Sequence, residues 1–432
     1  MKVLGDNKWL CVRMMGWLVL GWLPMACVDP DDVLLRGTLD VVVVDGTLTN
    51  LVEEQLITLN RSRADPLTGR FGVLPLTKAQ VEVVVDSAEV VKAEETEDGI
   101  YRLPGDFRGQ IGHAYQLRFT LSNGAHYVSS QQVMLPIASI DGASVQFNPI
   151  SLPPGLYPTN FRAGYDAYVD TNDPPGQRNY YRWDWILYEK QKWCKSCYQQ
   201  IYIDTVQTRY GQNGVVSTIK EAIEDCVNPL TVFTAFGFPN GDWYSDYLCR
   251  TPCWARIRNY NLNVFDDQLS NGGLLVGRKV AQVPLLTRQP ALLQLRQSSL
   301  TADAYRYFYL FQQQTQNTGG LADTPPTALV GNVRNVSNIR EDVVGFFTAS
   351  TVSEKQIWLD KKDATKLPLG AYDDAGTIVQ TDDELFYALK VRLPMQGPEG
   401  PPFTPGKPGR FITAPCTPGP NQTPLKPEGW RD

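Results

Sequence analysis

Histidine is almost absent from this chain. His113 and His126 are the only two among 432 residues, which excludes a metal site built on several imidazoles. The sequence also lacks the Gly-x-Ser-x-Gly pattern of a nucleophile elbow, the phosphate-binding P-loop and the Gly-x-Gly-x-x-Gly fingerprint that follows a strand in dinucleotide-binding folds. We therefore predict no catalytic residues, no metal site and no cofactor.

Methionine and long apolar runs are scarce as well. After residue 26 the chain has only Met134 and Met395, so aromatic and β-branched side chains must build the core, and these favour strands. No later segment has the about 20 consecutive apolar residues of a membrane-spanning helix. Acidic residues outnumber basic ones, with a formal net charge of −6, which argues against nucleic acid as a partner.

The first 26 residues have the composition of an export signal. Its basic start consists of Lys2, Lys8 and Arg13. The apolar run over residues 14–23 is too short to span a bilayer but suits a signal peptide. Ala26 and Cys27 resemble the end of a bacterial lipobox, in which the cysteine thiol is acylated before cleavage. We expect residues 1–26 to be removed and the acyl chains on Cys27 to anchor the protein. Ordinary secretion with an unmodified Cys27 is the alternative.

Three aspartates follow closely behind Cys27. They are Asp29, Asp31 and Asp32. Acidic residues at this place resemble the signal that sends lipoproteins of the Bacteroidota to the outer face of the outer membrane. A solvated acidic linker over residues 27–37 is the alternative interpretation. On the first interpretation, the protein is a lipid-anchored outer-membrane protein that faces the cell surface.

The remaining cysteines predict disulfides. Besides Cys11 and Cys27, the chain contains Cys194, Cys197, Cys226, Cys249, Cys253 and Cys416. An even number in an exported protein favours disulfide bonds. Zinc is the alternative, because the spacings C-x-x-C and C-x-x-x-C occur among zinc ligands, and free thiols are a third interpretation. The connectivity cannot be read from the sequence.

Strand patterns dominate the rest of the chain and predict a mainly β fold. Residues 38–137 contain about seven short strands, which is typical of an immunoglobulin-like or prealbumin-like sandwich. A β-branched run there ends at the turn pair Asp45-Gly46, and Asn123-Gly124 indicates a hairpin.

Residues 138–393 are predicted to form a larger β-rich domain. Alternation over residues 180–188 places one set of side chains on a single face of a strand. This set is Tyr181, Trp183, Trp185 and Leu187. Residues 255–265 alternate in the same way, and residues 343–359 supply one or two further strands.

One helix is predicted inside this larger domain. Thr301 or Ser299 caps its start, and it runs to about Thr315 before Gly319-Gly320. Its interior, AYRYFYLF, is aromatic around most of its circumference. We therefore expect the helix to be buried against a sheet; an aromatic binding platform is the alternative.

Two further segments are dominated by turn-forming residues. Residues 394–432 are rich in proline and glycine without a collagen period and predict an extended tail. We expect a disulfide from Cys416 to tie this tail back and Trp430 to pack at its end. Asp170, Asn172 and Asp173 offer oxygen ligands for Ca²⁺, but the same composition specifies a turn, which we favour.

Several segments together resemble one family. They are CVDPDD at 27–32, VVVVDGTLTN at 41–50, LNRSR at 59–63, RNYYRWDW at 178–185, CW at 253–254, the run 304–333 and VVGFFTASTVSEKQIWL at 343–359. These segments are similar to an uncharacterised family of Bacteroidota outer-membrane lipoproteins, known as a domain of unknown function. The resemblance implies genes beside those of TonB-dependent receptors and supplies no catalytic residues.

These features predict a surface lipoprotein that does no chemistry. It would act as an accessory or substrate-binding partner of a TonB-dependent β-barrel transporter, with a glycan or peptide as its ligand. Two alternatives remain open. One is a structural subunit of an outer-membrane assembly, secretion or motility complex, and the other is a glycan-acting enzyme whose paired carboxylates meet only in the fold.

The lipid anchor gives a first testable prediction. We expect Cys27→Ala to abolish metabolic labelling with a fatty-acid analogue and to move the protein from the detergent phase to the aqueous phase in a detergent partition, because the acylated thiol is gone. Cys11→Ala, the matched control inside the signal, should leave labelling unchanged. Persistent labelling of the Cys27→Ala protein would show that the anchor lies elsewhere.

Overall fold

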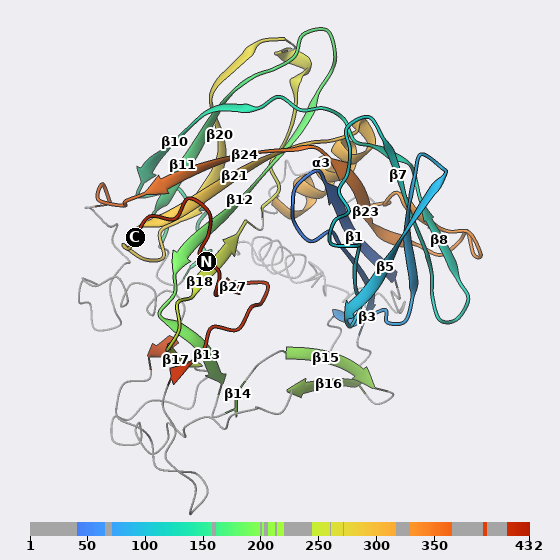
Figure 1. The fold of residues 1–432 in the computed structure, drawn as a ribbon, viewed down its shortest axis with the longest axis horizontal. Coiled ribbons are helices and arrows are strands. Elements are labelled where there is room, and N and C mark those ends of the chain that lie inside the picture. Colours follow the sequence, from blue (N-terminus) through green and yellow to red (C-terminus); the bar gives the residue numbers. More distant parts are fainter. Residues whose placement is uncertain are drawn as a thin grey trace, which may run out of the picture. The chain divides into compact units, whose positions relative to one another are not determined.

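In the computed structural model of this protein, strands make up most of the structure. The residues that the model describes include one α-helix (Figure 1). The described residues are 41–64, 71–157, 161–198, 201–202, 206–211, 214–219, 244–259, 261–270, 272–316, 329–364, 392–394 and 413–432. They belong to one compact unit, Leu39–Asp432. The predicted mainly β fold is confirmed.

The first sheet contains eleven strands among the described residues. They are β1 (Val41–Thr49), β2 (Leu56–Ala64), β3 (Phe71–Pro75), β4 (Gln80–Val85), β5 (Glu89–Glu97), β6 (Ile100–Arg102), β7 (Ala114–Thr120), β8 (His126–Ser129), β9 (Gln132–Val133), β22 (Val333–Asn335) and β23 (Val343–Ser350). Their order is β22-β8-β7-β4-β5-β6-β2-β1-β23, with β3 and β9 paired to β2 and β7. The two ends of this order meet, because the Asn332 side chain exchanges two hydrogen bonds of 2.9 Å with the backbone of Phe347. The sheet is therefore nearly closed around its core.

In strand β1, apolar side chains that alternate along the sequence are buried in the core of the first sheet. Val42, Val44 and Leu48 point inward and are at most 1% exposed. The predicted turn at Asp45-Gly46 is wrong, because β1 continues through both residues to Thr49. It pairs there with antiparallel β2 on one side and parallel β23 on the other, and this two-sided pairing overrides the local turn preference.

The hairpin predicted at Asn123-Gly124 is present. It joins the antiparallel strands β7 and β8, and Gly124 has a φ of +85°. The nearly closed sheet also takes β22 and β23 from the region expected to form the larger domain, so its hydrogen bonding extends beyond residues 38–137. A division into separate domains at residue 137 stays a prediction.

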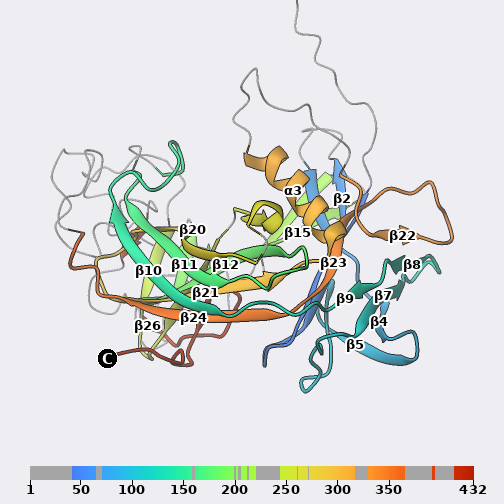
Figure 2. The ribbon, with the colours of Figure 1, turned by 90° about the horizontal axis from the view of Figure 1, so that it is seen from above.

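Two further sheets enclose a second core. One contains β10 (Ile140–Asn148), β11 (Gly164–Asn172) and β20 (Leu274–Pro284); the other contains β24 (Val352–Leu359), β21 (Ala291–Ser299), β12 (Tyr180–Lys190), β18 (Trp254–Arg258), β27 (Gln422–Thr423) and β19 (Val264–Asp266). Figure 2 shows β10, β11 and β20 curving over β21 and β24. Buried side chains from both sheets meet in a single apolar cluster.

The strand β12 confirms the predicted alternation. Tyr181, Trp183, Trp185 and Leu187 all belong to the buried cluster. The Trp183 indole N–H donates to the Gln297 side chain of β21 at 2.8 Å, so its polar atom is satisfied inside the core. The predicted strand over 255–265 is instead broken into β18 and β19. Between them, Asn259 accepts a hydrogen bond from the Trp185 backbone N–H with its side-chain oxygen.

The smaller sheets complete the described strands. One contains β13 (Trp193–Tyr198), β14 (Ile201–Tyr202), β17 (Tyr244–Cys249), β25 (Arg392–Pro394) and β26 (Thr413–Ala414), and the other contains β15 (Val206–Gly211) and β16 (Gly214–Ile219). The 3-10 helix η3 (Asp267–Leu269) follows β19.

The helix α3 (Ala302–Gln316) is only half buried. Thr301 caps it, accepting from the Ala304 N–H at 3.3 Å. Ala304 and Tyr307 pack on Phe346 of β23, whereas Tyr309, Leu310 and Phe311 are each about 40% exposed. The helix packs against the sheet as predicted, and it does so along one face. Among the described residues, none of the helices has the length and apolar character needed to cross a membrane.

Gly345 permits the contact between β1 and β23. Its φ is +103°, and a Cβ atom at this position would lie 1.8 Å from the carbonyl oxygen of Val44. We expect Gly345→Ala to lower the free energy of unfolding by about 3 kcal/mol, because it combines backbone strain with a clash against backbone. Urea unfolding measures this. Gly105→Ala, where a Cβ meets nothing within 4 Å, should change it by less than about 0.5 kcal/mol; equal effects would contradict the argument.

Candidate ligand-binding cavity

A cavity of about 940 Å³ opens beside the strands β12, β18 and β20. This volume lies near the upper end of the about 300–1,000 Å³ range of small-molecule sites. Its wall also includes residues of the loop at 152–157, Asn259 and residues 261–263 between β18 and β19, and Asn421 near the C-terminus. The cavity thus lies beside β18 and β20, which belong to the two facing sheets and are not hydrogen-bonded to each other.

Apolar side chains form part of the wall. They include Leu152, Leu156, Tyr157, Trp185, Ile257 and Leu286. The alternation of β12 and β18 explains two of them, because Trp185 and Ile257 lie on the strand faces that turn toward the second core. These rings and aliphatic groups offer an apolar surface against which a ligand can pack.

Side-chain amides are frequent in the same wall. They include Asn259, Asn261, Asn263, Gln282, Gln289 and Asn421. Some maintain the shape of the site: the Asn263 amide donates to the Val280 carbonyl at 2.7 Å and thereby connects the β18–β19 segment to β20. Each amide offers both donors and an acceptor, so the wall suits a ligand with many hydroxyl or amide groups.

One carboxylate, Glu189, appears among the described lining residues. It forms an ion pair of 2.6 Å with Lys361, and both side chains are almost fully buried, at 6% and 1% exposed. Lys361 also donates to the Thr287 carbonyl at 3.1 Å. A buried and paired carboxylate of this kind is part of the wall structure, since removing either partner would leave an uncompensated charge.

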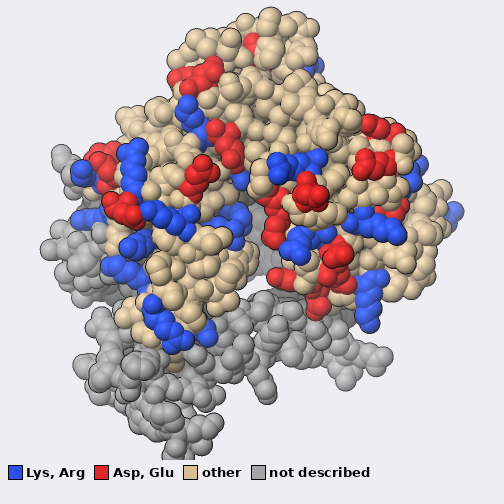
Figure 3. Space-filling view, viewed as in Figure 1, with Lys and Arg blue, Asp and Glu red and all other residues tan. Residues whose placement is uncertain are grey.

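Basic side chains outnumber this carboxylate around the cavity. They are Lys190, Lys192, Arg256, Arg258 and Lys279. Lys279 is neutralised by Asp166 at 2.8 Å, and Asp166 accepts from Asn148 and Ser151 as well. Figure 3 shows Lys and Arg side chains around the part of the surface where Figure 1 places β18 and β27. The site therefore has a positive character in a chain that is acidic as a whole.

Most of the chain, residues 30–356, matches the family described as a domain of unknown function, DUF4249. The chain belongs to the DUF4249 family. No curated protein matches it. The DUF4249 region supplies β12, β18 and β20, whereas Lys361 and Asn421 lie beyond its end.

The segment 413–432, here called the C-terminal strap, closes one side of the DUF4249 region. Its strand β27 pairs with β18, and β26 pairs with β17. Trp430 packs between two other rings, with ring centroids 6.0 Å from Trp254 and 5.2 Å from Trp358. The predicted packing of Trp430 and the tie through Cys416 are both confirmed, and Asn421 brings the strap to the cavity.

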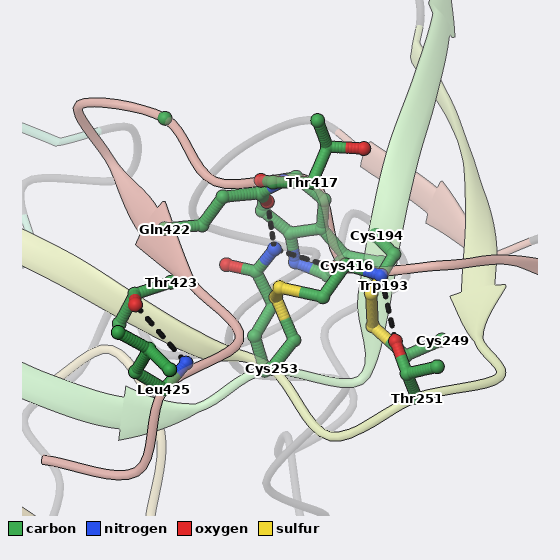
Figure 4. The surroundings of a disulfide bond; sticks show 12 residues. Trp193, Cys194, Cys249, Thr251, Cys253, Cys416, Thr417, Gln422, Thr423 and Leu425 are labelled. Carbon is green, nitrogen blue, oxygen red and sulfur yellow. Dashed lines mark hydrogen bonds between the residues drawn. A yellow bond between two sulfur atoms is a disulfide. The ribbon is translucent and has the colours of Figure 1, made fainter.

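Two disulfides hold this region together, Cys194–Cys249 and Cys253–Cys416 (Figure 4). The second joins the strap to the start of β18, and the Cys416 N–H also donates to Thr251 at 2.8 Å. The sulfur atoms of Cys194, Cys253 and Cys416 lie within 4.8 Å of one another, but the four described cysteines are paired with one another as disulfides. Cys226 and the side chain of Cys197 lie outside the described residues.

Of the other predicted site residues, Cys27 and the aspartates Asp29, Asp31 and Asp32 lie outside the described residues. Asp170 and Asp173 accept hydrogen bonds from the backbone N–H groups of Gly277 and Gly272, at 2.7 and 3.1 Å. These contacts connect β11 to β20 and to the residues just before β20.

The two histidines also lie outside the cavity, in the first sheet. His113 contacts Asp86 at 2.6 Å, and His126 contacts Thr120 at 2.7 Å. The backbone N–H of Ala114 and, after it, His113 keep the pKa of Asp86 below its usual value. Both histidines have local partners in the first sheet.

The lining residues were not singled out from the sequence. A signal existed in Asn259, Asn261 and Asn263, which recur at every second position directly after the alternating Arg256 and Arg258. In the fold these asparagines lie between β18 and β19. The other walls come from distant segments, so no local pattern could have joined them.

The strap disulfide is open to a direct test. We expect the double variant Cys253→Ser/Cys416→Ser to lose about 2–5 kcal/mol of unfolding free energy and to make the strap susceptible to protease, because only non-covalent contacts would then hold it. Limited proteolysis with mass spectrometry detects the released fragments. The control Cys194→Ser/Cys249→Ser retains the strap bond; equal protection of the strap in both proteins would contradict this role.

Proposed function

We propose that this protein is a non-catalytic, surface-exposed outer-membrane lipoprotein that binds substrate for a TonB-dependent transporter. The observation that carries the binding role is the cavity of about 940 Å³, with an apolar wall, many amides and several basic side chains. The anchor at Cys27, the surface location and the Bacteroidota origin rest on the sequence resemblances described above.

The composition of the cavity favours binding over catalysis. Hydrolysis of a glycosidic bond uses two carboxyl groups on either side of that bond. Among the described lining residues only Glu189 carries a carboxylate, and it is committed to its ion pair with Lys361. The size and polarity of the cavity likewise support ligand binding over a purely structural role.

The transporter partnership is tested by purification from native membranes. We expect the full-length protein, tagged after the exposed Asp432, to bring down a TonB-dependent β-barrel in stoichiometric amount from gently solubilised outer membranes, because an accessory protein must stay close to its pore. Mass spectrometry identifies the partner. A Cys27→Ala protein with the same tag is the control for association that depends on membrane anchoring.

Two results would contradict the proposed function. Recovery of secretion, assembly or motility subunits in place of a transporter would identify a structural subunit. Recovery of the protein alone, with unchanged growth of a deletion strain on every substrate of the neighbouring transporter, would remove the accessory role.

A further inference from the structure

Two buried aspartate side chains lie close together where the residues after β11 meet η3. Asp173 directly follows β11 and is 1% exposed, and Asp267 is the first residue of η3 and is 0% exposed. The side-chain nitrogen of Asn179 donates to both carboxylates, at 3.3 Å to Asp173 and at 3.1 Å to Asp267. Two carboxylates that share one donor and are almost fully removed from water repel each other, and this opposes folding unless a positive charge offsets it.

Hydrogen-bond donors surround this pair, but neither carboxylate forms an ion pair with a basic side chain among the described residues. Asp173 accepts from the Tyr181 hydroxyl and from the Gly272 backbone N–H, the latter at 3.1 Å. Arg178, whose charge acts on Asp267 from a distance, is itself ion-paired with Asp266. The described surroundings therefore leave the pair with an excess of negative charge.

One oxygen of the pair has no hydrogen-bond partner. It is Oδ1 of Asp267, which is buried and accepts from no described group, and such an atom loses its hydration without a replacement. Burial raises the pKa of Asp267, and contact with the Asp173 carboxyl group adds to the rise, although the Asn179 backbone N–H opposes it. Both observations indicate that a positively charged ligand at this oxygen would stabilise the fold.

The atoms around the pair are those that a hard cation prefers. Ca²⁺ is bound by carboxylate oxygens together with backbone and amide carbonyls. The carbonyls of Gly273 and Asn179 lie beside the pair, because they accept the backbone N–H groups of Asp173 and Asp267, at 3.3 and 3.2 Å. A shared proton is the other way to offset the repulsion. The N–H donors on both carboxylates favour the ionised form of each, which argues for the cation.

We infer that Asp173 and Asp267 together bind Ca²⁺, which fastens the residues after β11 to η3. Neither side chain is among the described residues that line the cavity, so the inference is independent of the proposed function. The sequence places Asp173 in a candidate Ca²⁺ group with Asp170 and Asn172. In the structure Asp170 accepts from the Gly277 N–H instead, and the second carboxylate comes from η3, which is distant in the sequence.

Thermal unfolding with and without calcium tests this site. The full-length lipidated protein in detergent is heated in about 10 mM calcium chloride, in EDTA, and in EDTA with sodium chloride at the same ionic strength. We expect calcium to raise the Tm by about 2–5 °C over both other conditions, from an affinity of about 10⁻⁴–10⁻³ M as in extracellular calcium-binding modules.

Removal of one charge should remove the effect of calcium. In Asp267→Asn the new amide can donate to Asp173, so we expect the variant to fold without the cation, to lose the calcium shift and to have a Tm in EDTA at least as high as that of the unaltered protein in EDTA. Asp173→Asn carries the same expectation. The control Asp303→Asn makes the same change of charge at a side chain on α3 that is 71% exposed, and it should keep the calcium shift.

Terbium luminescence reports binding at these residues directly. Tb³⁺ takes the same oxygen ligands as Ca²⁺, and Tyr181, which contacts Asp173, can transfer its excitation energy to a bound Tb³⁺. We expect sensitised emission that calcium displaces, and an affinity for Tb³⁺ at least about tenfold lower in Asp267→Asn, because one of two charged ligands is gone.

Three results would overturn the inference. These are equal Tm values in calcium and in EDTA, a sodium chloride shift as large as the calcium shift, or a folded Asp267→Asn protein that keeps both the calcium shift and the terbium emission. A Tm that ignores calcium but falls as the pH rises through the raised pKa of Asp267, with no such fall in Asp267→Asn, would assign a shared proton to the pair in place of the cation.

Discussion

The pairing of β12 on both of its edges is the constraint on which the larger part of the structure depends. β12 is hydrogen-bonded to β21 along one edge and to β18 and β19 along the other. Its inward side chains, among them Trp183, fill the core between two sheets. The cavity lies beside β18, and its wall includes members of this core such as Trp185.

Short-range sequence patterns account for much of the fold. The alternation around Trp183, the Asn123-Gly124 hairpin and the helix start at Thr301 each depend on neighbouring residues only, and all three are present. The prediction at Asp45-Gly46 was wrong for the opposite reason. There the decisive interaction is the pairing of β1 with β23, which comes from about 300 residues later in the chain, and no window around Asp45 contains it.

The cavity belongs to the same long-range class of features. Its walls come from the loop at 152–157, from β12, from β18, from β20 and from the strap, so its existence depends on how two sheets meet. The basic character of Arg256 and Arg258 is visible in the sequence, but their lack of acidic partners is not, since Glu53 and Glu354 are drawn to Arg296 only in the folded chain. Similarly, the cysteine count predicted disulfides, while the choice of partners required the fold.

The parallel contact between β1 and β23 has a consequence for biosynthesis. β1 is an early strand in the chain, and its partner β23 ends only at Ser350. The chain is synthesised from its N-terminus to its C-terminus. The edge of β1 that pairs with β23 in the folded protein therefore stays unpaired until most of the chain has been made. Exposed strand edges promote association between chains, and contacts between distant segments form slowly. We expect this protein to depend on a holding chaperone until the last strand of its first sheet arrives.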